Sequence, residues 1–212
     1  MATALSTLIP QLLVKAPMVP QPLAIFALRE AAALFCRETA LIKETLPAIT
    51  LVPGTAEYAM PTSAPSSTRA VKVLEAWVDD REITPITAAE IKESTSGNWT
   101  AHTGSVLHYL QEREDKILLY KIPEATGSLV VRAAIGPSLT ATSVDDMLVD
   151  RYWRAIVAGA LAELFETPGE TFSNPERAAV QQGIFMDYVG EAKLKAAKGF
   201  GTAKKRVKAH NF

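Results

Sequence analysis

The residues of this chain that could perform chemistry are few and widely spaced. The histidines are His102, His108 and His210, and the first two lie six residues apart across a predicted loop-to-strand boundary. That spacing belongs to no common zinc arrangement, and Cys36 is the single cysteine, which excludes an internal disulfide. The sequence therefore predicts no metal site and no other bound cofactor.

Catalysis by a nucleophile or by paired carboxylates also lacks a signature. No Gly-x-Ser-x-Gly motif is present, and Cys36 falls within a predicted helix, which is typical of a buried thiol. Asp145 and Asp146 could serve as general acid and base, but carboxylates in the first turn of a predicted helix interact favourably with its dipole. Residues 199–205 combine glycines and lysines without the spacing of a phosphate-binding loop. We therefore expect no catalytic residues and no enzymatic activity.

Composition and charge describe an ordinary globular chain with an unusual end. Of its 212 residues, 48% are hydrophobic and 21% charged, and no apolar run approaches the roughly 20 residues of a membrane span. The first ten residues lack the basic segment of a signal peptide, so we expect a protein made in the cytoplasm. Residues 192–212 contain seven Lys or Arg and no Asp or Glu, which leaves 15 basic and 23 acidic residues, a net charge of -8, in residues 1–191.

The basic C-terminal segment, residues 200–212, has two interpretations. It could be a solvated chain end, since lysines are favourable near a helix C-terminus. Alternatively it is an arm that docks on an acidic partner or lies on nucleic acid, with Val207 and Phe212 as apolar anchors and a reach of about 45 Å when extended. A nucleic-acid-binding module is therefore an alternative function. The basic residues of this arm are Lys204, Lys205, Arg206 and Lys208.

The elements around these residues begin with a predicted helical hairpin near the C-terminus. Its first helix is expected to be capped by Ser143, with Asp146 reaching back, and to end at the Pro-Gly corner of residues 168–169. A second helix is expected to begin after residues 173–174. The stripes that should pack together are Leu148, Tyr152, Ile156, Leu161 and Leu164, then Ala178, Gln182, Phe185, Val189, Ala192 and Ala196.

The N-terminal part predicts a short helix over residues 4–14 and a long one from Gln21 onward, separated by a proline-rich linker. The long helix is the expected packing partner of the C-terminal pair. Its apolar face is predicted to consist of Leu23, Phe26, Ala27, Leu34, Phe35, Leu41 and Ile42.

The middle of the chain changes to the two-residue period of strands. Residues 49–60 predict a short hairpin or a bent strand around Pro53-Gly54, and residues 70–86 predict a second hairpin. Thr87 and Glu90 predict the capping box of a short helix. Residues 61–68 are expected to form a loop before the second hairpin. Three further strands, over residues 105–110, 116–121 and 128–135, are expected to form an antiparallel meander.

The predicted fold is therefore α+β. It consists of a helical bundle, built from the N- and C-terminal helices, with a small antiparallel β domain inserted between them. The expected boundaries are residues 1–46 for the N-terminal helices, 47–140 for the β insertion, 141–199 for the helical hairpin and 200–212 for the basic arm.

Several short segments, spread over nearly the whole chain, form a recognisable series of spaced small and apolar residues without a catalytic signature. They are residues 28–32 and 35–39, 49–51 with Gly54, 57–58, 116–119, Pro123, 136–137, 155–161, 168–169, and 172–175 with Ala178. In kind and order these segments resemble the bacteriophage head-to-tail adaptor proteins, also called gatekeeper or tail tubular protein A-like proteins, although Phe172 stands where tryptophan is common.

The resemblance implies a structural virion protein of the neck, forming a ring, usually of twelve copies, beneath the portal protein and docking the next tail or nozzle component. It implies that the arm, with Val207 and Phe212, reaches clefts of the portal. An acidic body suits a bore through which packaged DNA passes without specific binding, since like charges repel phosphate. We expect no membrane partner. The small-residue helical hairpin suits side-by-side packing, so the predicted subunit-packing residues are Tyr152, Ile156, Phe185 and Val189.

Overall fold

The computed structural model describes residues 2–61, 68–95 and 98–199. The chain divides into two compact units. One is formed by Met1–Leu41 and Val144–Phe212, and we call it the helical unit; the other, Ile42–Ser143, is the β unit. The predicted α+β class is confirmed, but the β part is not small, since it comprises about half of the chain.

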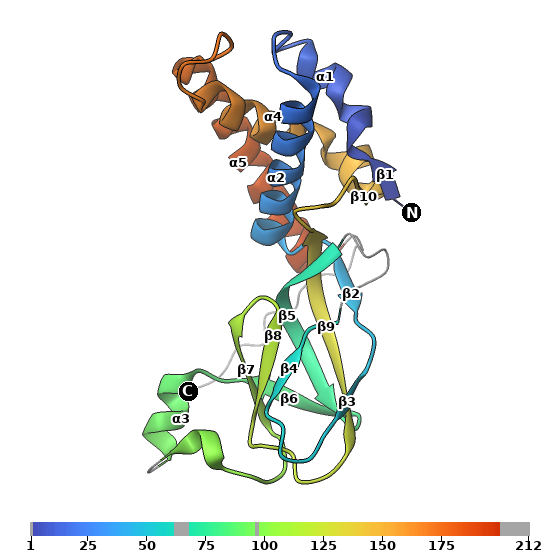
Figure 1. Cartoon of the computed structure of the whole chain (residues 1–212), viewed down its shortest axis with the longest axis vertical. Coiled ribbons are helices and arrows are strands. Elements are labelled where there is room, and N and C mark those ends of the chain that lie inside the picture. Colours follow the sequence, from blue (N-terminus) through green and yellow to red (C-terminus); the bar gives the residue numbers. More distant parts are fainter. Residues whose placement is uncertain (1, 62–67, 96–97, 200–212) are drawn as a thin grey trace, which may run out of the picture. The chain divides into compact units, whose positions relative to one another are not determined.

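The helical unit is built around three long helices, α2 (Gln21–Thr39), α4 (Asp146–Glu166) and α5 (Pro175–Lys198), which lie side by side (Figure 1). The short η1 (Leu5–Leu8) and α1 (Ile9–Leu13) precede them, within the predicted residues 4–14. Strand β1 (Ala2–Ala4) pairs with β10 (Ser143–Asp145), which leads directly into α4.

The first turn of α4 differs from the sequence prediction. Asp145, rather than Ser143, caps the helix, since its carboxylate accepts a hydrogen bond of 2.8 Å from the Met147 amide. Ser143 lies in β10, so the chain is still extended there and the helix begins later than predicted. Asp146 accepts a hydrogen bond from the Thr3 hydroxyl. Both carboxylates therefore have structural roles at the helix start, as the sequence indicated.

The remaining ends of the hairpin follow the predicted signals. α4 ends before Pro168 and Gly169, and Gly169 has φ +82°, a conformation that favours glycine. α5 is capped by Asn174, whose side chain accepts a hydrogen bond of 3.0 Å from the Arg177 amide, and Pro175 occupies its first turn.

Aromatic side chains fill the centre of the helical unit. The ring of Phe35 lies 5.1 Å from that of Tyr152 and 6.2 Å from that of Phe185, measured between centroids. Gly159 makes this packing possible, because a Cβ there would lie 2.8 Å from the Phe185 ring and 3.1 Å from the Ala31 Cβ. The three helices thus meet at a point where α4 has no side chain.

The predicted face of α2 is partly wrong. Phe26 is 48% exposed, and Leu23 and Leu34 are only half-buried. Alanines on the inward face let α2 approach α4 closely, so the helix turns its small residues inward and leaves larger apolar ones at the flanks. The buried residues of α2 are Ala24, Ala27, Leu28, Ala31, Ala32, Phe35, Cys36 and Thr39.

The β unit contains an eight-stranded sheet that curls into a half-barrel (Figure 1). Its order is β2-β9-β5-β6-β7-β8-β4, and β3 also pairs with β9. A short helix, α3 (Ala88–Ser94), begins with the predicted capping box, in which the Thr87 amide donates to Glu90 at 2.8 Å. The strands are β2 (Lys43–Thr45), β3 (Ile49–Leu51), β4 (Glu57–Ala59), β5 (Thr68–Val78), β6 (Arg81–Pro85), β7 (His108–Arg113), β8 (Lys116–Tyr120) and β9 (Gly127–Pro137).

Two predicted hairpins of the β unit are confirmed, and two other pairings are corrected. β5 pairs with β6 through a turn at Asp79 and Asp80, and β7 pairs with β8. β9 does not continue a meander, because it pairs with β5, β2 and β3. β3 and β4 form no hairpin either, because β3 pairs with β9 and β4 pairs with β8. They are linked instead by a hydrogen bond that the Tyr58 hydroxyl accepts from the Val52 amide.

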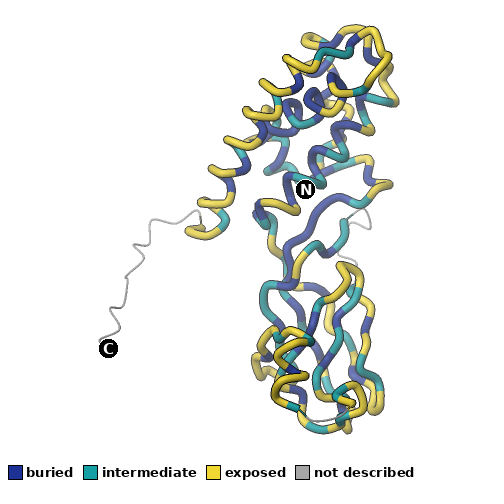
Figure 2. Tube along the Cα trace, turned by 90° about the vertical axis from the view of Figure 1, so that its left-hand side faces the viewer, coloured by how far each residue is buried: buried dark blue, intermediate teal, exposed yellow. Residues whose placement is uncertain are grey.

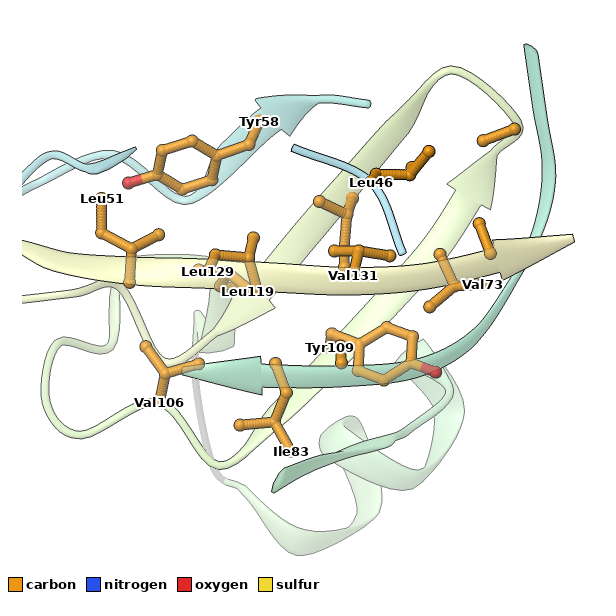
Figure 3. Close-up of a cluster of buried hydrophobic side chains, with 14 of the residues drawn as sticks. Leu46, Leu51, Tyr58, Val73, Ile83, Val106, Tyr109, Leu119, Leu129 and Val131 are labelled. Atoms are coloured by element: carbon orange, nitrogen blue, oxygen red, sulfur yellow. The ribbon is translucent and has the colours of Figure 1, made fainter. Parts of the chain in front are cut away.

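The sheet is mixed rather than purely antiparallel, because β6 and β7 are parallel. Helix α3 and the 3-10 turn η2 (Trp99–Ala101) lie in the connection between them, which provides the length that a parallel pairing needs. Side chains from seven strands fill the concave side, and Figure 3 shows Leu51, Val131 and Tyr109 among them. The curvature of the sheet therefore lets the β unit enclose a core of its own.

Candidate assembly surfaces

Large apolar side chains are exposed mainly on the helical unit. Seven of the ten that are exposed in the described part of the chain belong to it, and four of these are on α5. Exposed apolar groups that gather on one face commonly mark an interaction surface. The seven are Val14 (84% exposed), Met18, Phe26, Val180 (61%), Ile184, Met186 (50%) and Leu194 (61%).

Helix α5 has two faces of opposite character, and its tube in Figure 2 alternates between buried and exposed positions. The inner face carries Ala178, Phe185, Val189 and Ala192, all buried. The residues opposite follow alternating three- and four-residue spacing and therefore share one face. We call this set the α5 outer face: Val180, Gly183, Asp187, Gly190 and Leu194.

A hollow of about 440 Å³ lies between α1, α4 and α5, and we call it the apolar hollow. Helix α4 contributes the apolar residues Trp153, Val157 and Ala158 to its lining. Two cations line it: Lys15, and Arg154, whose guanidinium lies 5.2 Å from the centre of the Trp153 ring. The other lining residues are Gln11, Val14, Ile184 and Tyr188.

A second hollow of about 310 Å³, between α2, α4 and α5, is acidic. It is lined by Glu30, Glu163 and Glu166, with Arg37 as the cation. Partial burial raises the pKa of Glu163, and the nearby Glu30 and Glu166 raise it further. Oε1 of Glu30 is buried and makes no hydrogen bond with another described residue. Carboxylates gathered in this way favour an added positive charge.

The β unit carries an aromatic cluster around Tyr120. The Trp99 ring meets it edge-on at 6.2 Å, the His108 ring stacks on it at 6.5 Å, and the His102 ring is tilted at 6.5 Å. The two histidines predicted not to form a zinc site therefore flank one tyrosine. Among the described residues, no group of three or more His, Cys, Asp or Glu is placed to hold a metal ion.

The buried thiol expected at Cys36 is confirmed. Cys36 is 1% exposed, and burial, with a smaller contribution from Asp145, raises its pKa to about 12. A thiol with so high a pKa is protonated at neutral pH and is a poor nucleophile. None of the helices in the described part of the chain combines the length and hydrophobicity required of a membrane span.

The predicted site residues fall into two groups. All four of the predicted subunit-packing residues are buried in the helical unit, where they pack its own helices; a role for them between subunits stays a prediction. They are Tyr152 (2% exposed), Ile156 (0%), Phe185 (1%) and Val189 (1%). The predicted docking arm lies outside the described residues, and its members are Lys204, Lys205, Arg206, Val207, Lys208 and Phe212.

The sequence analysis missed the α5 outer face. Its signal was present, because Val180 and Leu194 stand at the ends of a three- and four-residue pattern that also contains both exposed glycines of the helix. That pattern was obscured by the stronger apolar stripe on the inner face. The apolar hollow could not have been read in the same way, because its residues come from separate segments.

Comparison with known protein families finds a match that spans both units. The family described as SU10 adaptor protein matches residues 5–206. No curated protein matches the chain.

Proposed function

Because the chain belongs to the SU10 adaptor protein family, a family of phage adaptor proteins, we propose that it connects the head and the tail of a bacteriophage particle. In this proposal it forms a ring of twelve identical copies beneath the portal protein. The next tail or nozzle component docks on that ring. The family match over nearly the whole chain is the observation that carries the proposal.

The surfaces of the helical unit support an assembly role. An adaptor must bind neighbouring copies of itself and at least one other protein. Exposed apolar surfaces that also carry a few charged groups provide such contacts. The α5 outer face and the apolar hollow have this character. The adaptor family is a structural class, so no catalytic step is proposed.

The basic arm is proposed to attach the ring to the portal protein. Residues 200–212 contain Lys204, Lys205, Arg206 and Lys208 and no acidic residue, which suits an acidic cleft. Val207 and Phe212 would add apolar anchors within that cleft. The net charge of -8 on residues 1–191 suits a bore that DNA crosses without adhering, because like charges repel the phosphates.

Deletion of residues 200–212 tests the attachment. The truncated chain should keep the circular dichroism spectrum and thermal transition of the full chain, because it retains every buried residue that the structure describes, the last of which is Ala192. It should no longer bind purified portal rings. A matched variant that changes the four basic residues to glutamine, with Val207 and Phe212 kept, separates the contribution of charge from that of the apolar anchors. Portal binding that survives the deletion would argue against the docking arm.

The alternative, a nucleic-acid-binding module, is favoured by the same cluster of four cations. It predicts that the full chain binds free DNA, that the affinity falls steeply with salt, and that binding disappears with residues 200–212. Cryo-electron microscopy of the virus particle separates the two: a ring of this chain beneath the portal supports the adaptor. Density elsewhere in the tail would instead indicate another tail or head-completion protein.

A further inference from the structure

We propose that neighbouring copies of this chain contact each other in a head-to-tail manner, the α5 outer face of one copy lying against the apolar hollow of the next. The inference rests on the proposed function, because it names the surfaces that would join the copies of the ring. Both surfaces belong to the helical unit.

The first observation concerns glycines in long helices. A glycine within a helix is unfavourable compared with alanine, so its presence calls for a reason. For Gly159 the reason is inside the chain, because a Cβ would meet Phe185 and Ala31. At Gly183 and Gly190 a Cβ would meet nothing within 4 Å. The chain itself therefore gives no steric reason for them, whereas a partner that approaches α5 closely does.

Large apolar groups flank these glycines. Val180 and Leu194 lie at the two ends of the α5 outer face and are each 61% exposed, and Met186 beside it is 50% exposed. Glycines at the centre allow close approach, and the larger side chains bury area on either side of the contact. This is the arrangement of a helix face that packs against another protein surface.

The apolar hollow is complementary to the α5 outer face in hydrophobicity and in charge. Its lining includes apolar and aromatic side chains, among them Trp153 and Val157, and its cations are Lys15 and Arg154. Asp187, at the middle of the α5 outer face, makes no ion pair with another described residue. A contact between the two surfaces would bring this carboxylate to the cations and would bury apolar groups on both sides.

Charge also decides between the possible symmetries. Two α5 outer faces packed antiparallel about their midpoints would place Asp187 against the Asp187 of the second copy. Two apolar hollows facing each other would oppose Lys15 and Arg154 to the same cations. Both symmetric pairings bring like charges together, and only the contact between unlike surfaces pairs opposite charges. Repeated contacts between unlike surfaces close into a ring when the rotation permits.

Charge reversal tests the contact in particles from an adaptor-deficient phage that is complemented with variants of the full chain. Asp187→Lys should lower the number of infectious particles at least tenfold, and Lys15→Glu with Arg154→Glu should do the same. A chain that carries all three changes should recover assembly, because a positive charge on the α5 outer face would then meet two negative charges in the apolar hollow. A purely structural role for these exposed residues predicts no such recovery.

A steric variant provides a second readout. Gly183→Leu with Gly190→Leu should leave the thermal transition of the free chain unchanged or raised, because both positions are open, and should prevent assembly. Gln182→Leu is the control, because Gln182 is exposed on α5 and lines the acidic hollow instead of the α5 outer face, and it should assemble normally. Assembly of the double leucine variant as in the unmodified chain would overturn the proposed contact.

The outcomes distinguish the contact from the proposed function. Rings of the chain at the neck, formed equally well by Asp187→Lys, would overturn the contact and leave the adaptor role standing. Absence of the chain from the particle would overturn the adaptor role.

The contact would then be decided by carbodiimide cross-linking of concentrated purified protein, mixed from ¹⁴N- and ¹⁵N-labelled copies. An intermolecular link from Lys15 to Asp187 supports it, and its absence overturns it.

Discussion

At the scale of single residues, the three glycines within α4 and α5 show how the same residue type serves different purposes. Gly159 lies where α2, α4 and α5 meet, and it is needed because the Phe185 ring and the Ala31 methyl occupy the space of a side chain. Gly183 and Gly190 are exposed and have open space around them. Helix propensity treats all three alike, and only their surroundings separate them.

This contrast predicts opposite effects of one substitution. Gly159→Ala should lower the free energy of unfolding by about 1–3 kcal/mol, because the added methyl group overpacks the centre of the helical unit. Gly183→Ala and Gly190→Ala should each raise it by up to about 1 kcal/mol, because alanine is the better helix former. Urea unfolding of the three variants measures the differences. A loss of stability at all three positions would contradict the open surroundings of α5.

The acidic hollow predicts a pH-dependent stability. Burial, then the charges of Glu30 and Glu166, raise the pKa of Glu163 above its usual 4.5, so the folded protein holds the ionised carboxylate at a cost. That cost is present above the raised pKa and disappears as the pH falls through it. Glu163→Gln should therefore raise stability at pH 7 by about 0.5 kcal/mol, a small value because water screens a partly exposed group.

The check is the melting temperature of Glu163→Gln and of the unmodified chain between pH 4 and pH 8. The advantage of the variant should shrink as the pH is lowered toward the unfolded pKa. Added salt should also reduce it, since the contribution of the two neighbouring glutamates is screened. An advantage that stays constant across this pH range would contradict the assignment to ionisation.

At the scale of elements, the start of α4 shows how a neighbouring strand decides where a helix begins. Ser143 and Asp145 are both good capping residues, and local sequence favoured the first. Pairing of β10 with β1 keeps residues 143–145 extended, so the first free amides of the helix belong to the residues that follow Asp145. The cap is therefore selected by a strand from the other end of the chain.

The two capping candidates give a matched pair of substitutions. Asp145→Ala should lower the free energy of unfolding by about 1 kcal/mol, because it removes the hydrogen bond to the Met147 amide and a favourable charge at the helix start. Ser143→Ala should change it by less than about 0.5 kcal/mol. Thermal unfolding followed by circular dichroism at 222 nm compares the two. A larger loss of stability in Ser143→Ala than in Asp145→Ala would indicate that Ser143 caps the helix, as the sequence suggested.

At the scale of the whole molecule, the β unit has its own core although it interrupts the helical unit in sequence. Fifteen buried residues from seven of its strands and adjoining loops form one cluster, which Figure 3 illustrates. A domain with a core of this kind can fold by itself. The chain thus uses two independent cores, one from helices and one from strands.

This organisation predicts that residues 42–143 form an autonomous domain. Expressed alone, the fragment should give a β-type circular dichroism spectrum, a dispersed proton NMR spectrum and a cooperative thermal transition. Ala133→Asp, which places a charge at a fully buried position of β9, serves as the control and should abolish all three. A fragment that stays unfolded while the full chain folds would show that the β unit depends on the helical unit.

The sequence by itself determined the local features of this protein. Apolar periodicity and the signals of helix starts and ends identified the long helices, the Pro168-Gly169 corner and the capping box at Thr87, because each depends on residues close together in the chain. The same signals narrowed the cap of α5 to Ser173 or Asn174, and the structure shows that it is Asn174. The short motifs also indicated an adaptor family, which the match over residues 5–206 confirmed.

Only the tertiary structure decided which elements meet. β9 was predicted as the last strand of a meander, but it is an interior strand with many buried residues, and it lies between β5 on one side and the edge strands β2 and β3 on the other. The inward face of α2 and the apolar hollow likewise depend on packing between segments distant in sequence. Local patterns fix the period of an element, whereas the choice of partner depends on how the whole chain buries its apolar surface.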